Sequence, residues 1–371
     1  MASLQAFMAS LAEKTNPKDY AFAADVKAHI PIYDAVQINQ MGSADKQALR
    51  QEWAQCWQHQ AGVMVVRGLI PEATVDAVTE VFMRLLKEQH KEHNLGDHFA
   101  PMGANGRVWN ALEKLAVAAP QAFIDYYKNP VLADICQAWL GPDYRLTSQV
   151  NLVYPGGTAQ QPHRDYHLGF TTPDELAAYP LHVQTMSAML TLQGAVAHGH
   201  MPVASGPTML LPYSQRYAHG YGLYQQEDFM SFFAEHAVQL PLQKGDGVFF
   251  SPALMHAAGA NSTSDIERMA NLLQVSSPFG KAMENVDTNR MQLATYETLQ
   301  AQQLGDGELA AVSTALSDNY PFPTNMDRDA PAQSLKPLSG KDILLQALQD
   351  KATKQQLHEA LQAQKWRQKT R

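Results

Sequence analysis

The sequence has little that would support sulfur chemistry or a covalent framework. Its 371 residues include two cysteines, Cys56 and Cys136, and no Cys-x-x-Cys pair. This excludes a disulfide-stabilised scaffold and a thiolate zinc site. The glycine-rich phosphate-binding motifs and the Gly-x-Ser-x-Gly motif of serine hydrolases are missing as well.

Basic residues and long hydrophobic runs are also scarce. Lysine and arginine total 28 against 36 acidic residues, a net charge of -8, which argues against a dedicated nucleic-acid-binding protein. No apolar run approaches the length of a membrane span, and the first residues lack the basic and apolar regions of a secretory signal. We therefore expect a cytoplasmic protein with neither nucleic-acid nor membrane partners.

Patterns of helix and strand divide the chain into three regions of one catalytic domain. Residues 1–143 are predicted to be mostly helical and to contribute a strand and helices around a core. Within them, the β-branched run 61–70 predicts a buried strand, and an apolar stripe after Pro71 predicts a helix. A further helix is expected over 121–143, interrupted near Pro130.

The second region, residues 144–280, alternates short apolar runs with Gly/Pro turns. This alternation predicts a sandwich or closed barrel of short strands. The apolar segments that predict strands are 144–157, 182–196, 205–214, 237–254 and 268–280. The third region, 281–371, is predicted to be a loop followed by one C-terminal helix over 340–364. That helix packs on its own chain or on a second subunit, so either a monomer or a homodimer is expected.

The segment "QQPHRDYHLGF" places several metal-ligand side chains close together. In a strand, His163, Asp165 and His167 would share one face and Arg164 would point away from it. Downstream, His256 follows a strongly apolar strand. Two imidazoles and one carboxylate form the facial triad that holds Fe(II) with positions open for ligands, although zinc also accepts such ligands.

Arg268, twelve positions after His256, opens the next predicted strand. By itself it would be a surface arginine paired with Asp265 or Glu267. Together with the triad it is better explained as a clamp, because a guanidinium binds a carboxylate through two parallel hydrogen bonds. An iron site that uses a 2-oxo diacid needs such a partner for the distal carboxylate.

These motifs resemble the phytanoyl-CoA dioxygenase-like (PhyH) branch of the Fe(II)/2-oxoglutarate-dependent oxygenases. The resemblance covers roughly residues 62–280. It is carried by "GVMVVRGLIPEATVDAVTEVF", "LGPDYRLTSQVNLVYPGG", "PHRDYH", "SGPTMLLPYSQRY" and "KGDGVFFSPALMHAAGAN…R". It implies a mainly β fold with flanking helices, built on a double-stranded β-helix (a jelly roll, or cupin-like core).

The resemblance also implies roles for individual residues. His163, Asp165 and His256 would be the iron ligands, and Arg268 would bind the distal carboxylate of 2-oxoglutarate. Asn151 matches a position that contacts 2-oxoglutarate in some relatives, although it is equally explained as an ordinary strand amide. The implied reaction hydroxylates an unactivated C–H of a small molecule while 2-oxoglutarate and O2 become succinate and CO2. The carboxylate of Asp165 favours hydroxylation, or a related oxidation such as desaturation, over halogenation.

Two other functions remain open from the sequence. His198 and His200 form a His-x-His pair, as in cupin-like metalloenzymes that do not use 2-oxoglutarate. In the oxygenase interpretation this pair lies in a loop at the pocket mouth or in solvent. A non-catalytic jelly-roll binding module is the other alternative. His167 is expected either in the wall of the substrate pocket or in a structural role.

Overall fold

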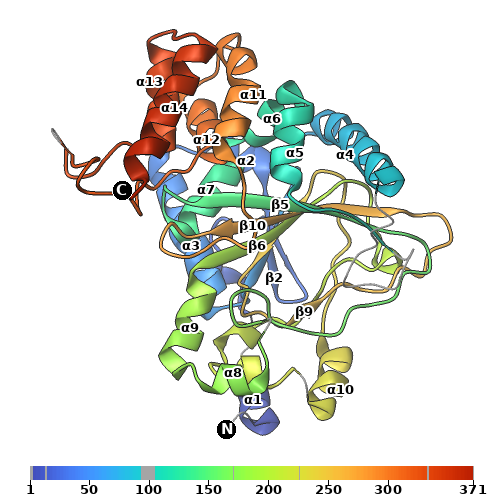
Figure 1. Ribbon diagram of the computed structural model, residues 1–371. Helices are drawn as coiled ribbons and strands as arrows, with labels where there is room; N and C mark the ends of the chain where they lie inside the picture. The colour runs from blue at the N-terminus through green and yellow to red at the C-terminus, as the bar shows by residue number, and fades with distance from the viewer. Residues whose placement is uncertain are drawn as a thin grey trace.

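The computed structural model describes residues 3–12, 15–92, 105–169, 171–224, 226–331 and 334–370. An eight-stranded, mostly antiparallel sheet runs through the middle of the molecule (Figure 1). In spatial order its strands are β1 (Asp25–Lys27), β2 (Ile30–Asp34), β3 (Val63–Arg67), β8 (Gly247–Phe250), β6 (Thr191–Ala197), β10 (Arg268–Ser276), β5 (Arg145–Val153) and β4 (Asn105–Val108). The strand predicted over 61–70 is β3, which joins the N-terminal part to the sheet by pairing with β8.

A second, smaller antiparallel sheet is built from short pieces. β7 (Met209–Leu210) pairs with β9 (His256–Ala257), and single bridges add Val238 beside β7 and His163 beside β9. The two sheets enclose one cavity, since residues from both line it. This pair of facing sheets is the predicted jelly roll, which is confirmed.

Alternating side chains give the large sheet two different faces. One face packs against helices in the main hydrophobic core, to which the strands contribute side chains such as Met64, Val196 and Phe249. Their neighbours Val65, Ala195 and Val248 belong to a separate cluster on the opposite face. That opposite face is the one that borders the cavity.

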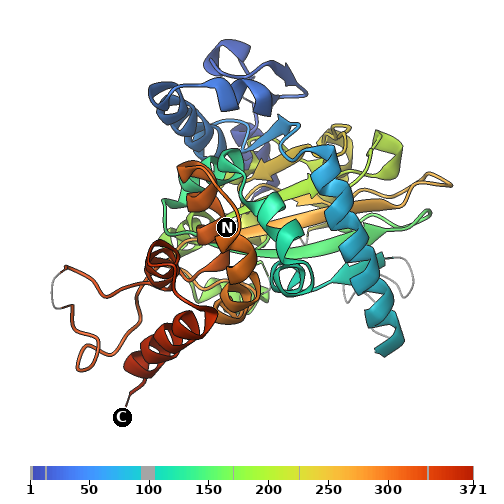
Figure 2. The same ribbon diagram turned by 90° about the horizontal axis from the view of Figure 1, so that it is seen from above.

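Helices cover the face of the sheet that points away from the cavity (Figure 1). They are α2 (Ala35–Gln40), α3 (Ser43–His59), α4 (Glu72–Glu92), α5 (Ala111–Ala118), α6 (Pro120–Tyr127), α7 (Pro130–Leu140), α11 (Thr288–Gln300), α12 (Asp306–Leu316), α13 (Gly340–Gln349) and α14 (Lys354–Gln368). Seen from above, α4 and the α13–α14 pair lie toward opposite ends of this layer (Figure 2). The helix expected after Pro71 and the break at Pro130 are confirmed by α4, α6 and α7.

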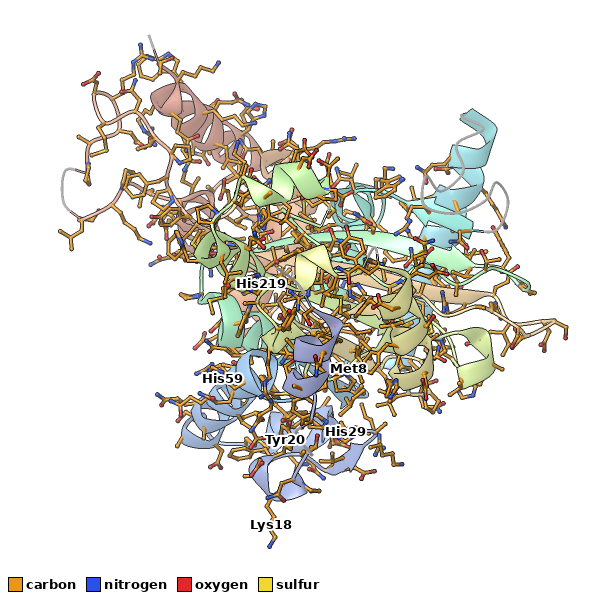
Figure 3. All side chains as sticks on the ribbon, turned by 90° about the horizontal axis from the view of Figure 1, so that it is seen from below. Met8, Lys18, Tyr20, His29, His59 and His219 are labelled. Atoms are coloured by element: carbon orange, nitrogen blue, oxygen red, sulfur yellow. The ribbon has the colours of Figure 1, made fainter. Side chains whose placement is uncertain are left out.

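The remaining elements lie on the cavity side or at the N-terminal end. They are α1 (Leu4–Ser10), α8 (Pro173–Ala177), α9 (Leu181–Met189), α10 (Glu227–His236) and the 3-10 turns Pro17–Asp19, Val203–Ser205, Ser214–Arg216 and Gly220–Gly222. Figure 3 views the molecule from this side, with exposed Lys18 extending away from the body.

Two expectations about secondary structure were wrong. The run 182–196 is not strand throughout, because α9 occupies its first half and only Thr191–Ala197 pairs in the sheet. Its leucine, methionine and alanine residues favour helix. The predicted single C-terminal helix is two helices, since Lys351 takes a left-handed conformation and Thr353 forms a capping box with Gln356 at the start of α14.

Candidate metal centre and its cavity

The segment that carries His163 and Asp165 is held against β9 by backbone hydrogen bonds. The amide of His163 donates to the carbonyl of His256 (3.0 Å), and the amide of His256 donates back (3.2 Å). Regular extension ends at Tyr166 and His167, whose φ angles are +67° and +39°. The chain turns here, so the prediction that His167 continues the strand alternation was wrong.

Three potential ligand groups converge on one point of the cavity. The Nε2 atom of His163 lies 3.5 Å from Oδ1 of Asp165, and Nε2 of His256 lies 3.4 Å from Oδ2 of the same carboxylate. One ligand atom from each residue can be chosen so that all three lie within 4.8 Å of one another. The structure thus brings together the three residues singled out in the sequence, from two neighbouring segments of the small sheet.

Backbone carbonyls set the tautomers of both histidines. Nδ1 of His163 lies 2.8 Å from the carbonyl of Gln161, and Nδ1 of His256 lies 2.9 Å from the carbonyl of Leu254. A carbonyl can only accept, so each Nδ1 carries the proton and each Nε2 keeps its lone pair. Both lone pairs are therefore available to a metal beside the Asp165 carboxylate, as a site for a divalent transition metal requires.

Burial and neighbouring charges shift the pKa values of two of these groups, Asp165 and His163. Burial by itself would raise the pKa of Asp165, but the contacts that its carboxylate makes with His256, His163 and Gln193 bring that pKa well below its usual range. Burial, followed by the charge of His256, lowers the pKa of His163. Near neutral pH the centre therefore presents an ionised carboxylate and a neutral His163 imidazole.

Arg164 points away from this centre, as expected from the sequence. Its guanidinium is buried and donates to the carbonyls of Ser214 (2.6 Å) and Tyr217 (2.9 Å). It also lies over the ring of Tyr221, 5.4 Å from the centroid. Arg164 thus fastens the segment that carries His163 and Asp165 to the 3-10 turns at 214–222.

Arg268 lies in the cavity wall and is only 7% exposed. Its Nη1 donates to the carbonyl of Gly259 at 3.3 Å, and its guanidinium forms no ion pair with any described carboxylate. Burial lowers its pKa to about 10, so the group is still charged at neutral pH. A buried cation without a counter-ion is costly, and a ligand carboxylate would supply the missing charge.

Asn151 and His167 also reach the cavity. Asn151 pairs with Ala270 in the sheet register, two residues from Arg268, and its buried Oδ1 has no hydrogen-bond partner in the described part of the chain. Nδ1 of His167 lies 3.3 Å from Oγ of Ser187 in α9. The cavity itself measures about 930 Å³, which leaves room for a second molecule beside a small diacid.

The His-x-His pair lies elsewhere. His198 is buried on the helical side of the sheet, with Nδ1 2.8 Å from Oγ1 of Thr79 and Nε2 3.1 Å from the hydroxyl of Tyr126. His200 is exposed and bonded to Gln243. The expectation that His198 lies in solvent or at the pocket mouth was wrong, because its position at the end of β6 directs it into the helical core. The pair therefore does not join His163, Asp165 and His256 in a cupin-type metal site.

Sequence reasoning missed the three glutamines in strands that face the cavity, Gln149, Gln193 and Gln274. Each occupies an inward position on β5, β6 or β10, next to at least one apolar residue of the core that faces the helices. A glutamine at alternate positions of a buried strand was the available signal, because polar side chains are rarely buried there without a role.

A family model for phytanoyl-CoA dioxygenase (PhyH) matches residues 58–270, more than half of the chain. The chain belongs to this family. Membership agrees with the resemblance carried by the His-x-Asp segment and the residues after His256. As a PhyH-family protein it is an oxygenase of the type that depends on iron and 2-oxoglutarate and acts on small molecules.

Individual relatives are distant. The dioxygenase aneA of Aspergillus aculeatus (strain ATCC 16872 / CBS 172.66 / WB 5094) is 23% identical over 266 residues, which are 66% of this chain and 78% of that protein. Among solved structures, the carbocyclase SnoK from nogalamycin biosynthesis, described as non-heme and alpha-ketoglutarate-dependent, is 18% identical with a TM-score of 0.46, covering 72% of this chain and 94% of SnoK. AviO1 from Streptomyces viridochromogenes Tue57 is 16% identical with a TM-score of 0.44, covering 65% of this chain and all of AviO1.

The helices give no sign of a membrane span. Within the described ranges, none combines the length and the apolar character that crossing a bilayer requires.

Proposed function

We propose that this PhyH-family protein hydroxylates an unactivated C–H bond of a small-molecule substrate. In this proposal His163, Asp165 and His256 hold Fe(II), while Arg268 and Asn151 bind 2-oxoglutarate and His167 borders the substrate. When bound, iron and 2-oxoglutarate supply the oxidation, in which 2-oxoglutarate and O2 become succinate and CO2 as the substrate gains oxygen.

One observation supports the proposal above all others. The cavity that contains the three converging ligand groups also contains Arg268, a buried arginine that pairs with no carboxylate among the described residues. A metal that takes two imidazoles and a carboxylate, together with a co-substrate that ends in a carboxylate, would satisfy both features. A metal site alone would leave Arg268 without a role.

Each group has a separate task in this scheme. The Nδ1–H bonds to Gln161 and Leu254 orient the two imidazoles, and Gln193 orients the carboxylate of Asp165. Arg268 would fix the distal end of the diacid, and the amide of Asn151 would donate to its other end. The apolar wall around Phe250 and Leu272 would exclude water from the reacting atoms.

The carboxylate of Asp165 bears on the outcome of the reaction. It occupies the place among the ligands that a halide takes in halogenating relatives, so oxygen transfer to carbon is the favoured result. Desaturation by the same site would remove two hydrogens without adding oxygen, and the two outcomes differ in product mass.

The proposal is tested in two steps. Binding of 2-oxoglutarate is measured anaerobically with Fe(II) by the appearance of the visible charge-transfer band and by the rise in melting temperature. Succinate formation is then followed with a metabolite mixture, whose components are analysed by mass spectrometry for the gain of one oxygen atom. A protein that binds neither Fe(II) nor 2-oxoglutarate would refute the proposal, and a product that has only lost two hydrogens would replace hydroxylation by desaturation.

A further inference from the structure

The cavity extends well beyond the region that iron and 2-oxoglutarate would occupy. Two of the overlooked glutamines lie there, Gln149 on β5 and Gln274 on β10. Gln274 is six residues along β10 from Arg268, a distance of about 20 Å at the rise of an extended strand. A five-carbon diacid held by Arg268 cannot reach that far, so this part of the wall is available to the substrate.

The two glutamines are diagonal neighbours on adjacent strands. Gln149 pairs with Leu272, which is two residues from Gln274 on the same face. Diagonal neighbours lie about 7–8 Å apart, within reach of long side chains. Leu272, which lies between them, also lines the cavity, so the two amides flank one stretch of wall.

Arg107 determines which way the amide of Gln149 faces. Nη1 of Arg107 donates to Oε1 of Gln149 at 3.3 Å. A guanidinium has donors only, so the glutamine must present its oxygen to it and turn its NH2 group elsewhere. That NH2 group contacts Sδ of Met283 at 3.8 Å, which is a weak acceptor that a better one can displace.

Tyr166 also engages the amide oxygen of Gln274. The phenol of Tyr166 is buried and donates to Oε1 of Gln274 at 3.1 Å. The Nε2 atom of Gln274 bonds to no described residue and borders the cavity, whose wall Gln274 helps to form. Both glutamines therefore have their oxygens engaged and present N–H donors.

The charges along the cavity favour the same kind of ligand. Asp165 is the sole carboxylate among the described cavity-lining residues, and it belongs to the proposed iron site. Arg107 and Lys281 contribute positive charge on the substrate side, although the whole chain carries a net charge of -8. Among the described lining residues, a cationic substrate would find no carboxylate other than that of the proposed iron site.

We propose that this wall recognises a substrate through a carbonyl or carboxylate oxygen that accepts hydrogen bonds from the side-chain amides of Gln149 and Gln274. The inference rests on the proposed function, because it places this oxygen beside the same iron site. It assigns Gln149 and Gln274 as specificity-determining residues and excludes substrates that bind through an ammonium group.

Three probes of matched size and different polar groups test the proposal. Phenylacetate, phenylacetamide and phenethylamine are added to protein loaded with Mn(II) and saturating N-oxalylglycine, and binding is measured by ligand-observed NMR. Phenylacetate and phenylacetamide should bind, while phenethylamine should not. Because N-oxalylglycine fills the co-substrate site, its own binding is measured first as an independent check of the proposed function.

Isosteric variants then locate the contact. Gln149→Glu and Gln274→Glu each keep the shape of the side chain but replace donors by an acceptor-only carboxylate, so each should weaken phenylacetate binding about tenfold or more. Gln243→Glu adds the same charge at an exposed position and should change nothing. Melting curves establish that each variant is folded. In Gln149→Glu the new carboxylate still has Arg107 as a positively charged partner, which favours folding of that variant.

The outcomes distinguish failure of this substrate assignment from failure of the proposed function. Three results would overturn the assignment while leaving the proposed function intact. They are equal binding of phenethylamine and phenylacetate, failure of phenylacetate and phenylacetamide to bind to protein that holds N-oxalylglycine, and wild-type affinity for phenylacetate in both Glu variants. Failure of N-oxalylglycine itself to bind would overturn the proposed function.

Discussion

The side-chain amide of Gln193 donates a hydrogen bond to Oδ2 of Asp165, the same oxygen that lies 3.4 Å from Nε2 of His256. Gln193 comes from β6 in the large sheet, whereas Asp165 follows the bridge to β9 in the small one. This bond links the two sheets across the cavity and holds the carboxylate in a fixed orientation toward the histidines.

We expect removal of that donor to weaken metal binding. Gln193→Met preserves side-chain volume but leaves Asp165 free to rotate, and loss of such an outer partner typically costs 10–100-fold in metal affinity. Anaerobic Fe(II) titration checks this. Gln243→Met, at an exposed position, is the control, and an unchanged affinity in Gln193→Met would show that the bond does not orient the ligand.

Loss of the carboxylate itself should have a larger effect. Asp165→Ala leaves two imidazoles, so Fe(II) affinity should fall by more than about 100-fold, beyond the range for an outer partner. Metal content after anaerobic reconstitution measures this, with Asp174→Ala in exposed α8 as the control. Full iron occupancy in Asp165→Ala would remove Asp165 from the proposed ligand set.

Arg268 should act on the co-substrate and not on the metal. Arg268→Met removes the proposed partner of the distal carboxylate, and a bidentate charge-assisted contact of about 3 kcal/mol corresponds to roughly 100-fold in 2-oxoglutarate affinity. Succinate formation against 2-oxoglutarate concentration should show a raised KM, while Fe(II) binding stays as in the wild type. Arg290→Met is the exposed control. An unchanged KM would contradict the assignment.

His198 should make the folded state sensitive to acid. Burial lowers its pKa to about 3, so the folded protein keeps it neutral while the unfolded chain takes up a proton below about 6.5. The contribution of His198 to the free energy of unfolding is therefore fully present above its pKa in the unfolded chain, and it is lost as the pH falls toward its pKa in the folded protein. The loss from this residue between pH 7 and pH 5 is about 2 kcal/mol.

Urea unfolding at pH 7, 6 and 5 measures this contribution as a difference between variants. His198→Gln should lose that part of the pH dependence, whereas His200→Gln, two residues away and exposed, should keep it. Identical pH dependence in the wild type and His198→Gln would mean that other groups account for any acid sensitivity of the fold.

The sequence identified the parts of the fold that follow a short-range pattern. The strand at 63–67, the helix after Pro71 and the break at Pro130 were predictable because apolar periodicity and proline act locally. The helices α11 and α12 were not predicted, since their sequences show weak apolar periodicity and they are held mainly by packing on α5, α6 and α7.

The candidate site also contains residues that the sequence identifies and residues whose roles only the structure shows. His163, Asp165, His256 and Arg268 could be named from their order and spacing, and the structure places all four at one cavity. The position of His167 could not be derived, because alternation fails where two successive residues take positive φ. The donor role of Gln149 and Gln274 depends on partners from distant strands and turns, which no local pattern contains.

Arg164 gives the site a further property. Arg164 stands between His163 and Asp165, and its buried guanidinium donates to the carbonyls of Ser214 and Tyr217. These contacts are made entirely within the protein. The segment is therefore already ordered before any metal arrives, and binding need not supply the free energy to organise it. The apoprotein should accordingly be preorganised, with a site that selects among metals by its fixed shape and not by folding around whichever ion is present.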